Sequence, residues 1–231
     1  QALRCDPTSF VLNEPSFVGE LHHQAGLETD EKRRRLYRAG LNAFSLARRR
    51  REVRTIIKAS SISLLEFGCL RRTFPKTLTV FLHRNPFEVL ASYLALPPTF
   101  VSEFPFKGTG TTSEDILRQR LHVLVNVQRR IYETFLRSPE KSSAIILNHR
   151  ELNLRTIENL YQKLGLELTS PLRKGIRDSF SIYSKDQSQR RRFTGDRRSK
   201  LVSRMLLEHG DFIRASLLPL YERVERMATE P

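Results

Sequence analysis

The sequence predicts an α/β protein with a parallel sheet, helices on both faces of that sheet, and more helix than strand. Three observations lead to this class. Short apolar runs alternate with segments of helical periodicity, an order that favours parallel pairing through right-handed crossovers. Hydrophobic residues make up 39% and charged residues 28% of the 231 residues, as is typical of a globular chain. No apolar run approaches the roughly 18 residues that a membrane-spanning helix needs.

In the first part of the chain, up to residue 74, the sequence predicts at most two strands, and two helices. Its predicted elements are a short strand at best within residues 3–21, a basic helix from Asp30 to about Arg51, a strand over residues 53–58 and a helix over residues 60–74. Asp30 is a good N-cap, and Pro75 stops the second helix. The basic helix carries its apolar residues at helical spacing.

The stretch "FLHRNPFEVLAS" predicts a strand that leads directly into a helix. The apolar run over residues 78–84 ends in Arg84, Asn85 is a strong helix cap, and Pro86 suits the first helical position. Such a junction directs backbone N–H groups and the positive end of the helix dipole to one place, which favours anion binding. Arg84 adds a forked, permanently charged donor there.

The remainder of the chain continues the alternation. Its predicted elements are a surface loop over residues 97–113, a long helix from Ser113, a strand over residues 144–148, a helix over residues 154–166 that closes at Gly165, and a basic helical tail from Pro171 that is interrupted at residues 184–200.

The charge of the chain is unusual for its size. The 40 Lys and Arg residues exceed the 25 Asp and Glu residues and give a net charge of +15 at pH 7. This charge favours polyanions, phosphorylated small molecules, acidic glycans or anionic lipid surfaces, although solvated helix faces account for it equally well. The two cysteines, Cys5 and Cys69, lack metal-ligand spacing, so no metal is predicted. The absence of an N-x-S/T sequon argues against a glycosylated secretory domain.

In their order and residues, these elements resemble the core of the sulfotransferases, which move a sulfuryl group from 3′-phosphoadenosine 5′-phosphosulfate to an acceptor. The family pattern is a strand that ends in Lys, a helix, "FP", a strand that ends in R-x-P, and a Ser eight residues after the Arg. The stretch "IIKASSISLLEFGCLRRTFPKTLTVFLHRNPFEVLASY" is similar to it, and Arg84, Pro86 and Ser92 fit it. "AIILNHRELNLRTIENLYQKLGLEL" and "LLPLYERVER" resemble later parts of the core, so the likeness covers most of residues 11–226.

The resemblance implies a P-loop NTPase-like architecture in one domain over residues 1–231, with 3′-phosphoadenosine 5′-phosphosulfate as co-substrate and no metal ion. The family also carries a phosphate-binding loop on its first strand, a sequence such as P-[KR]-[ST]-G-[ST]-T. No such loop is present in the chain. Because the family places it upstream of a stretch like "LNEPSF", we expect it just before Gln1, in a longer protein.

The resemblance also implies donor-binding roles. Arg84 would bind the 3′-phosphate of the donor, with the Ser92 hydroxyl as a second donor group; the alternative is a surface arginine that pairs with a carboxylate such as Glu88. Lys58 would neutralise charge on the sulfuryl oxygens or the leaving phosphate. The alternative for Lys58 is a strand-end lysine that extends into water.

Transfer to a hydroxyl or amine requires a base that accepts the proton of the acceptor. Cytosolic members have K-T-H at the second strand, with His as the base, whereas this chain has "KAS", and Ser60 cannot act unaided. Glu14 is the better candidate, because other members place a carboxylate in this segment, although a solvated turn residue is equally consistent. His22 and His23 are second candidates, and His83 is typical of a packed histidine.

Two basic clusters compete for the C-terminal phosphate-binding segment of the family, which resembles R-K-G followed by G-D-W. The "RKG" at residues 173–175 lies within a predicted helix and is therefore the weaker match. "RRRFTGDRR" follows a helix and a polar loop, and we expect one of Arg190, Arg191 or Arg192 to contact the 3′-phosphate. The alternative is a solvated run of charge.

The sequence thus predicts a sulfotransferase whose acceptor is a hydroxyl or amine of a small molecule or glycan. The alternative function is a non-catalytic basic module that binds nucleic acid or sulfated glycan through "EKRRRLYR" and "LARRRREVR". Nucleic acid is the less favoured partner, because neither aromatic platforms nor a groove-reading helix accompany these runs.

Overall fold

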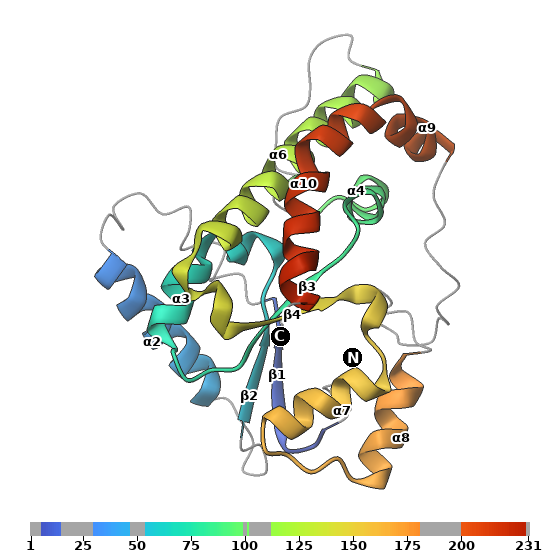
Figure 1. Ribbon diagram of the computed structural model, residues 1–231. Helices are drawn as coiled ribbons and strands as arrows, with labels where there is room; N and C mark the ends of the chain where they lie inside the picture. Colours follow the sequence, from blue (N-terminus) through green and yellow to red (C-terminus); the bar gives the residue numbers. More distant parts are fainter. Residues whose placement is uncertain are drawn as a thin grey trace. The chain divides into compact units, whose positions relative to one another are not determined.

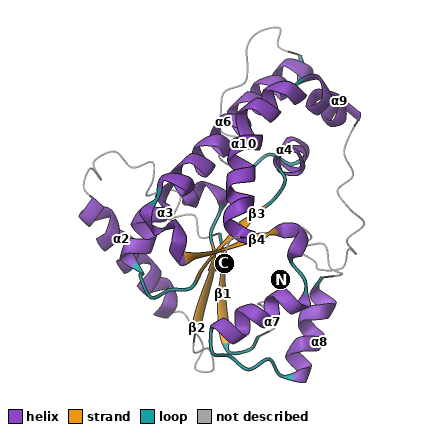
Figure 2. Cartoon of the chain, viewed as in Figure 1, coloured by secondary structure: helices purple, strands orange, loops and turns teal. Residues whose placement is uncertain are grey.

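The computed structural model describes residues 6–14, 30–46, 54–98, 101, 112–180 and 200–229. Over these residues the chain is helix-rich α/β, with two small parallel sheets of two strands each (Figure 2). Within these ranges, no helix is both long and apolar enough to cross a membrane.

The three predicted strands are present. They are β2 (Arg54–Lys58), β3 (Thr79–His83) and β4 (Ala144–Asn148), and the short strand near the N-terminus is β1 (Ser9–Asn13). β1 pairs in parallel with β2, and β3 pairs with β4, so the described strands form two sheets where the sequence predicts one. The alternation of strands and helices indicates parallel pairing but does not specify which strands are neighbours.

The chain divides into two compact units. Unit 1 comprises Gln1–Thr79, Ser138–Ala144 and Glu151–Thr194, and unit 2 comprises Val80–Arg137, Ile145–Arg150 and Gly195–Pro231. The sheet β1–β2 therefore belongs to unit 1, and the sheet β3–β4, except for the first residue of each strand, belongs to unit 2.

Unit 1 combines its sheet with four α-helices and two 3₁₀ turns among the described residues (Figure 1). These are α2 (Asp30–Leu46), the 3₁₀ turn η2 (Ser61–Glu66), α3 (Phe67–Thr73), the 3₁₀ turn η3 (Pro139–Ser143), α7 (Leu154–Lys163) and α8 (Ser170–Ser179). The helix predicted over residues 60–74 begins as η2 and becomes α-helical only at Phe67. The "SIS" at its start explains this difference, because serine and β-branched isoleucine are weak helix formers.

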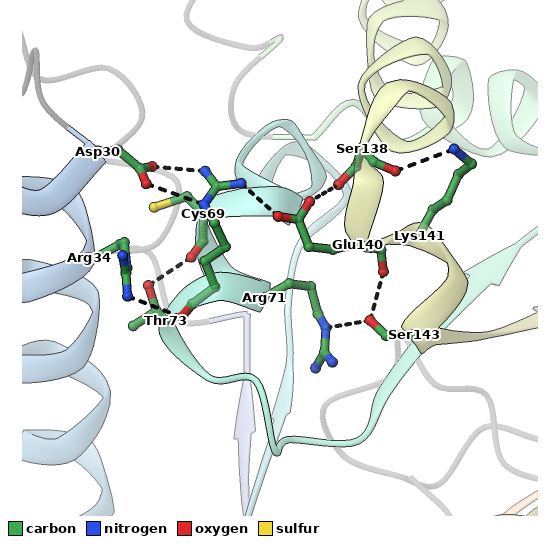
Figure 3. A network of polar contacts seen from close by, with 10 residues as sticks. Asp30, Arg34, Cys69, Arg71, Thr73, Ser138, Glu140, Lys141 and Ser143 are labelled. Atoms are coloured by element: carbon green, nitrogen blue, oxygen red, sulfur yellow. Dashed lines mark hydrogen bonds and ion pairs between the residues drawn. The ribbon is translucent and has the colours of Figure 1, made fainter.

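Two small cores and a polar network hold unit 1 together. Tyr37 on α2 is fully buried against Cys69 of α3, and Ile157, Tyr161 and Ile176 join α7 to α8. The polar network lies around Asp30 and Glu140 and is drawn in Figure 3. In it, Arg72 Nη2 lies 3.0 Å from Asp30 Oδ1 and Arg72 Nη1 lies 2.8 Å from Glu140 Oε1, so one arginine ties α3 to both α2 and η3.

Gly165 closes α7, as the sequence predicts. Its φ of +65° lies in the left-handed region, the Gly165 N–H donates to the carbonyl of Gln162, and the Leu166 N–H donates to the carbonyl of Tyr161. This pair of bonds is the Schellman motif, in which glycine is favoured because it has no Cβ.

Unit 2 packs its helices around one larger core. They are α4 (Pro86–Ala95), α6 (Ser113–Arg137), α9 (Lys200–Glu208) and α10 (Gly210–Thr229), and Figure 1 shows α6 and α10 side by side. Fully buried aliphatic side chains from all four helices form the core: Leu90, Leu121, Val125, Met205, Ile213 and Leu217. The long helix predicted from Ser113 is confirmed, and its residues Leu117, Leu121, Leu124 and Val125 face this core.

The start of α4 also agrees with the sequence. The Asn85 side chain accepts a hydrogen bond from the Phe87 N–H at 3.0 Å, and Pro86 occupies the first helical position. The junction of β3 and α4 thereby places Arg84 between a strand end and a helix start.

Candidate functional site

Glu14 and Lys58 meet at the carboxyl end of the sheet β1–β2. The register sets Asn13 opposite Lys58, so Glu14 directly follows the last paired residue. The Glu14 N–H donates to the Lys58 carbonyl at 2.7 Å, and Lys58 Nζ lies 2.6 Å from Glu14 Oε1. The two side chains are 46% and 63% exposed, so a ligand from solvent can reach both.

The backbone at Glu14 is in an unusual conformation. Its φ is 49°, in the left-handed region, and no other described residue apart from glycine has a positive φ. A side chain there costs about 1–2 kcal/mol relative to the right-handed conformation. The conformation is retained at the point where Glu14 contacts Lys58, and strained residues of this kind cluster at functional sites.

The Glu14–Lys58 pair combines two complementary chemical groups. A carboxylate accepts a proton, and an ammonium offers three N–H donors to the oxygens of an anion. The sequence assigns both residues to one reaction although 44 positions separate them, and the structure brings them into contact. Their roles as base and as charge-neutralising group stay predictions.

In unit 2, Arg84 forms part of a two-arginine cluster that consists of Arg84, Glu88 and Arg150. Arg84 Nε lies 2.7 Å from Glu88 Oε2, and Arg150 Nη2 lies 2.7 Å from Glu88 Oε1. The hydrogen bonds from Arg150 and Arg84 lower the pKa of Glu88 to about 2. The pairing of Arg84 with Glu88, the alternative raised by the sequence, is thus present in the structure, and 3′-phosphate binding by Arg84 stays a prediction.

Side chains of β4, α6 and α10 fix the backbone positions of both arginines. The Tyr132 hydroxyl on α6 donates to the Arg84 carbonyl at 3.4 Å, and Asn148 Oδ1 accepts from the Arg150 N–H at 2.9 Å. Asn148 Nδ2 in turn donates to the Tyr221 hydroxyl at 3.1 Å and to Glu225 on α10. The cluster therefore lies at the carboxyl ends of β3 and β4, the edge where α/β sheets bind ligands.

His83, at the end of β3, is a packed histidine, as the sequence indicates. Its side chain is 1% exposed, with Nδ1 3.4 Å from Glu225 Oε1, and its ring contacts Phe81 and Tyr221. Burial, followed by a hydrogen bond to Glu225, raises the pKa of Tyr221 to about 12, so that phenol is protonated at neutral pH.

The backbone N–H groups at the start of α4 are already used. Phe87 donates to the Asn85 side chain, Glu88 and Val89 donate to the Asn85 carbonyl, and Pro86 has no N–H. The cap therefore supplies partners for these groups, and direct anion binding by them stays a prediction. The charged side chains of Arg84 and Arg150 lie at the same junction.

The other predicted site residues differ in what the structure says of them. Ser92 lies on α4, in the same unit as Arg84. Arg190, Arg191, Arg192, His22 and His23 lie outside the described residues. The "RKG" at residues 173–175 lies within α8, which confirms that this stretch is part of a helix. Its arginine, Arg173, is 2.9 Å from Glu158.

Arg150 is the residue that the sequence reasoning missed. It follows the predicted strand 144–148 by two positions, in "LNHR". The same rule that directs attention to Lys58 and Arg84, namely that ligands bind beyond the carboxyl ends of parallel strands, also applies to this strand.

No group of three or more His, Cys, Asp or Glu side chains suited to a metal ion occurs among the described residues. The Cys69 thiol lies in the core of unit 1, and burial raises its pKa to about 11, so it is protonated at neutral pH.

Neither a scan against protein-family models nor a search of curated proteins finds a match to this chain. A function for the chain must therefore be argued from its own residues.

Proposed function

We propose that this chain has the P-loop NTPase-like architecture and the activity of a sulfotransferase. It would transfer a sulfuryl group from 3′-phosphoadenosine 5′-phosphosulfate to a hydroxyl or amine of a small-molecule or glycan acceptor. The observation that carries the proposal is the contact between Glu14 and Lys58, 2.6 Å apart at the carboxyl end of a parallel strand pair. The ordered motifs that end in Arg84, Pro86 and Ser92 support the same reaction.

In this proposal, Glu14 accepts the proton of the acceptor while the oxygen or nitrogen of that acceptor attacks the donor sulfur. The bond between sulfur and the bridging oxygen of the 5′-phosphate breaks, and its electrons remain on that oxygen. Lys58 donates hydrogen bonds to the sulfuryl oxygens or to the leaving phosphate, where negative charge grows. The products are the sulfated acceptor and 3′-phosphoadenosine 5′-phosphate.

The ion pair between Glu14 and Lys58 is compatible with these roles. An exposed pair of this kind contributes about 0–1 kcal/mol, so an anionic donor readily displaces the carboxylate from the ammonium. Lys58 then contacts the donor, and Glu14 is released next to it for the acceptor. In the absence of donor, each group serves as the counter-ion of the other.

Within unit 2, Arg84 and Ser92 would bind the 3′-phosphate. A hydrogen bond from a charged donor is worth about 1.5–3 kcal/mol, and one from a hydroxyl about 0.5–1.5 kcal/mol. Together these two hydrogen bonds suffice to favour a nucleotide with a 3′-phosphate over one without it. Arg190, Arg191 and Arg192 remain candidates for a further contact.

Calorimetric titration with 3′-phosphoadenosine 5′-phosphate and with adenosine 5′-phosphate tests the proposal. We expect the chain to prefer the first nucleotide and Arg84→Ala to remove about 1.5–3 kcal/mol of this preference. Ser92→Ala should remove less. Arg137→Ala is the matched control, because the Arg137 side chain is 80% exposed on α6. Its removal should weaken the binding of both nucleotides slightly and equally.

The second candidate, a basic binding module, is favoured by the net charge of +15. However, three arginines of α2 already have protein partners: Arg33 bonds to Glu66, Arg34 to the Arg72 carbonyl and Arg35 to Glu31. Less of their charge is then available to a polyanion. Equal losses in Arg84→Ala and Arg137→Ala would favour this second function over the enzyme.

A further inference from the structure

We propose that Glu88 is a built-in counter-ion that fills the 3′-phosphate subsite when no nucleotide is bound, and that Arg150 is the second arginine of this subsite. The inference rests on the proposed function, since it concerns the subsite assigned to Arg84. It adds a residue that binds the phosphate and a residue that competes with it.

The geometry of the cluster is that of two donors sharing one anion. Arg84 and Arg150 each lie 2.7 Å from a different oxygen of the same carboxylate. A terminal phosphate also presents several oxygens to adjacent guanidinium groups, and arginine is the side chain best suited to such paired contacts. The Glu88 carboxylate therefore marks the position that phosphate oxygens would take.

The main chains of the two arginines are held in place by groups other than Glu88. The Arg84 carbonyl accepts from the Tyr132 hydroxyl, and the Arg150 N–H donates to Asn148, which is itself bonded to α10. When Glu88 is displaced, the backbone positions of both arginines are retained. The points from which both side chains extend are thus fixed before the nucleotide arrives, and Glu88 keeps the two guanidinium groups together until then, which reduces the cost of binding.

The solvent exposure of the cluster and the charges of the two anions both allow a phosphate to displace the Glu88 carboxylate. The Arg150 side chain is 64% exposed, whereas Arg84 and Glu88 are 29% and 23% exposed, so the cluster opens to solvent on the Arg150 side. A phosphate monoester carries a charge of about −1.5 to −2 near neutral pH, compared with −1 for a carboxylate. The phosphate monoester therefore has the stronger attraction to two guanidinium groups.

This arrangement also selects among phosphates. A phosphodiester within a nucleic acid carries one negative charge per phosphate, no more than Glu88 itself, and so gains little by displacing it. A terminal 3′-phosphate does gain. The built-in carboxylate thereby favours a 3′-phosphorylated nucleotide over a polynucleotide, in a chain whose net charge of +15 would otherwise attract both.

The test is calorimetric titration of the 231-residue chain and four variants, Glu88→Gln, Arg150→Ala, Glu114→Gln and Arg84→Ala, with 3′-phosphoadenosine 5′-phosphate and adenosine 5′-phosphate. Glu88→Gln should tighten binding of the 3′-phosphorylated nucleotide by about fivefold or more, and Arg150→Ala should weaken it by about fivefold or more, each with less effect on adenosine 5′-phosphate.

Glu114→Gln is the matched control. Glu114 also lies in the first turn of a helix of unit 2, with Arg204 at 2.6 Å and Arg118 at 4.0 Å. Its substitution makes the same change in net charge and breaks a similar ion-pair cluster. It should leave both affinities within about twofold of the unmodified chain, because it lies away from Arg84 and Arg150 in sequence and bonding.

The outcomes separate the two proposals. If Arg84→Ala abolishes the 3′-phosphate preference but Glu88→Gln fails to tighten binding, the counter-ion inference is overturned and the proposed function stands. If neither the unmodified chain nor Glu88→Gln prefers the 3′-phosphorylated nucleotide, both fall. Should Glu88→Gln lose its helical circular dichroism, Arg150→Ala decides alone, and an unchanged preference in that variant overturns the inference.

Discussion

At the scale of single residues, Glu14 combines a strained backbone with a reactive side chain. Its φ of 49° ends β1 sharply, while its N–H still bonds to the Lys58 carbonyl and its carboxylate reaches Lys58 Nζ. A residue with only a structural role at this turn would be better replaced by glycine or asparagine, which adopt this conformation more readily. The choice of glutamate is therefore consistent with the proposed base.

Glu14→Gln should lower the turnover of sulfuryl transfer by about 100-fold or more, while donor affinity barely changes, because the amide keeps the shape of the side chain and loses the ability to accept a proton. Steady-state kinetics of sulfuryl transfer to an acceptor measure this turnover. Glu31→Gln is the control, since Glu31 is an exposed glutamate of unit 1 that pairs with Arg35 at 2.7 Å. A loss of turnover in Ser60→Ala or His22→Ala, with none in Glu14→Gln, would show that the base is assigned wrongly.

The sequence indicated which side chains to consider for the site more readily than it indicated which distant residues contact them. Arg84 and Lys58 were recognisable because each ends an apolar run, a local feature of the sequence. Glu88 was recognisable as a partner of Arg84 because it lies only four positions away. The contact of Lys58 with Glu14 and that of Glu88 with Arg150 were not, since they join residues 44 and 62 positions apart. Such contacts depend on strand pairing and helix packing, which local patterns do not specify.

At the scale of elements, the caps were the most predictable features. Asn85 with Pro86 and Gly165 act through contacts within a few residues, so the sequence contains nearly all the information. The start of α3 and the existence of β1 were less predictable. The turn η2 reflects a balance of weak propensities, and β1 is a strand chiefly because β2 provides a parallel partner over Ser9–Asn13.

Gly165→Ala should destabilise unit 1 by about 1 kcal/mol, because alanine resists the left-handed conformation. A Cβ at this position meets no atom within 4 Å, so the cost is purely conformational. Gly165→Asn should cost less, since asparagine tolerates this region of φ. Urea unfolding monitored by circular dichroism gives both free energies of unfolding. An alanine variant as stable as the asparagine variant would contradict this account of the α7 terminus.

At the scale of the whole molecule, the net charge of +15 and the local arginines act over different distances. Added salt screens exposed charges beyond about 10 Å at 0.1 M and about 3 Å at 1 M, and hydrogen-bonded contacts are less affected. The general field therefore raises the affinity for any anion, whereas the proposed Arg84 subsite would distinguish one nucleotide from another.

Raising the salt concentration should weaken the binding of both nucleotides, and that of 3′-phosphoadenosine 5′-phosphate more, because its second phosphate adds charge, but a preference for this nucleotide should remain at 1 M salt. Titrations at low and high sodium chloride measure this preference. A preference that disappears together with the affinity would mean that the basic surface, and not the 3′-phosphate subsite, determines binding.

The two units have a consequence for synthesis on the ribosome. Unit 1 begins with Gln1–Thr79 but includes Glu151–Thr194, and unit 2 begins at Val80 but includes Gly195–Pro231. Neither unit can therefore complete its core from its first segment alone, since α7 and α8 are translated after α6, and α9 and α10 are translated after α8. Multidomain chains usually fold from the N-terminus as each domain leaves the ribosome. Here residues 80–137 of unit 2 leave the ribosome before unit 1 is complete, and the apolar faces of α4 and α6 are exposed until α9 and α10, which share their core, have been translated.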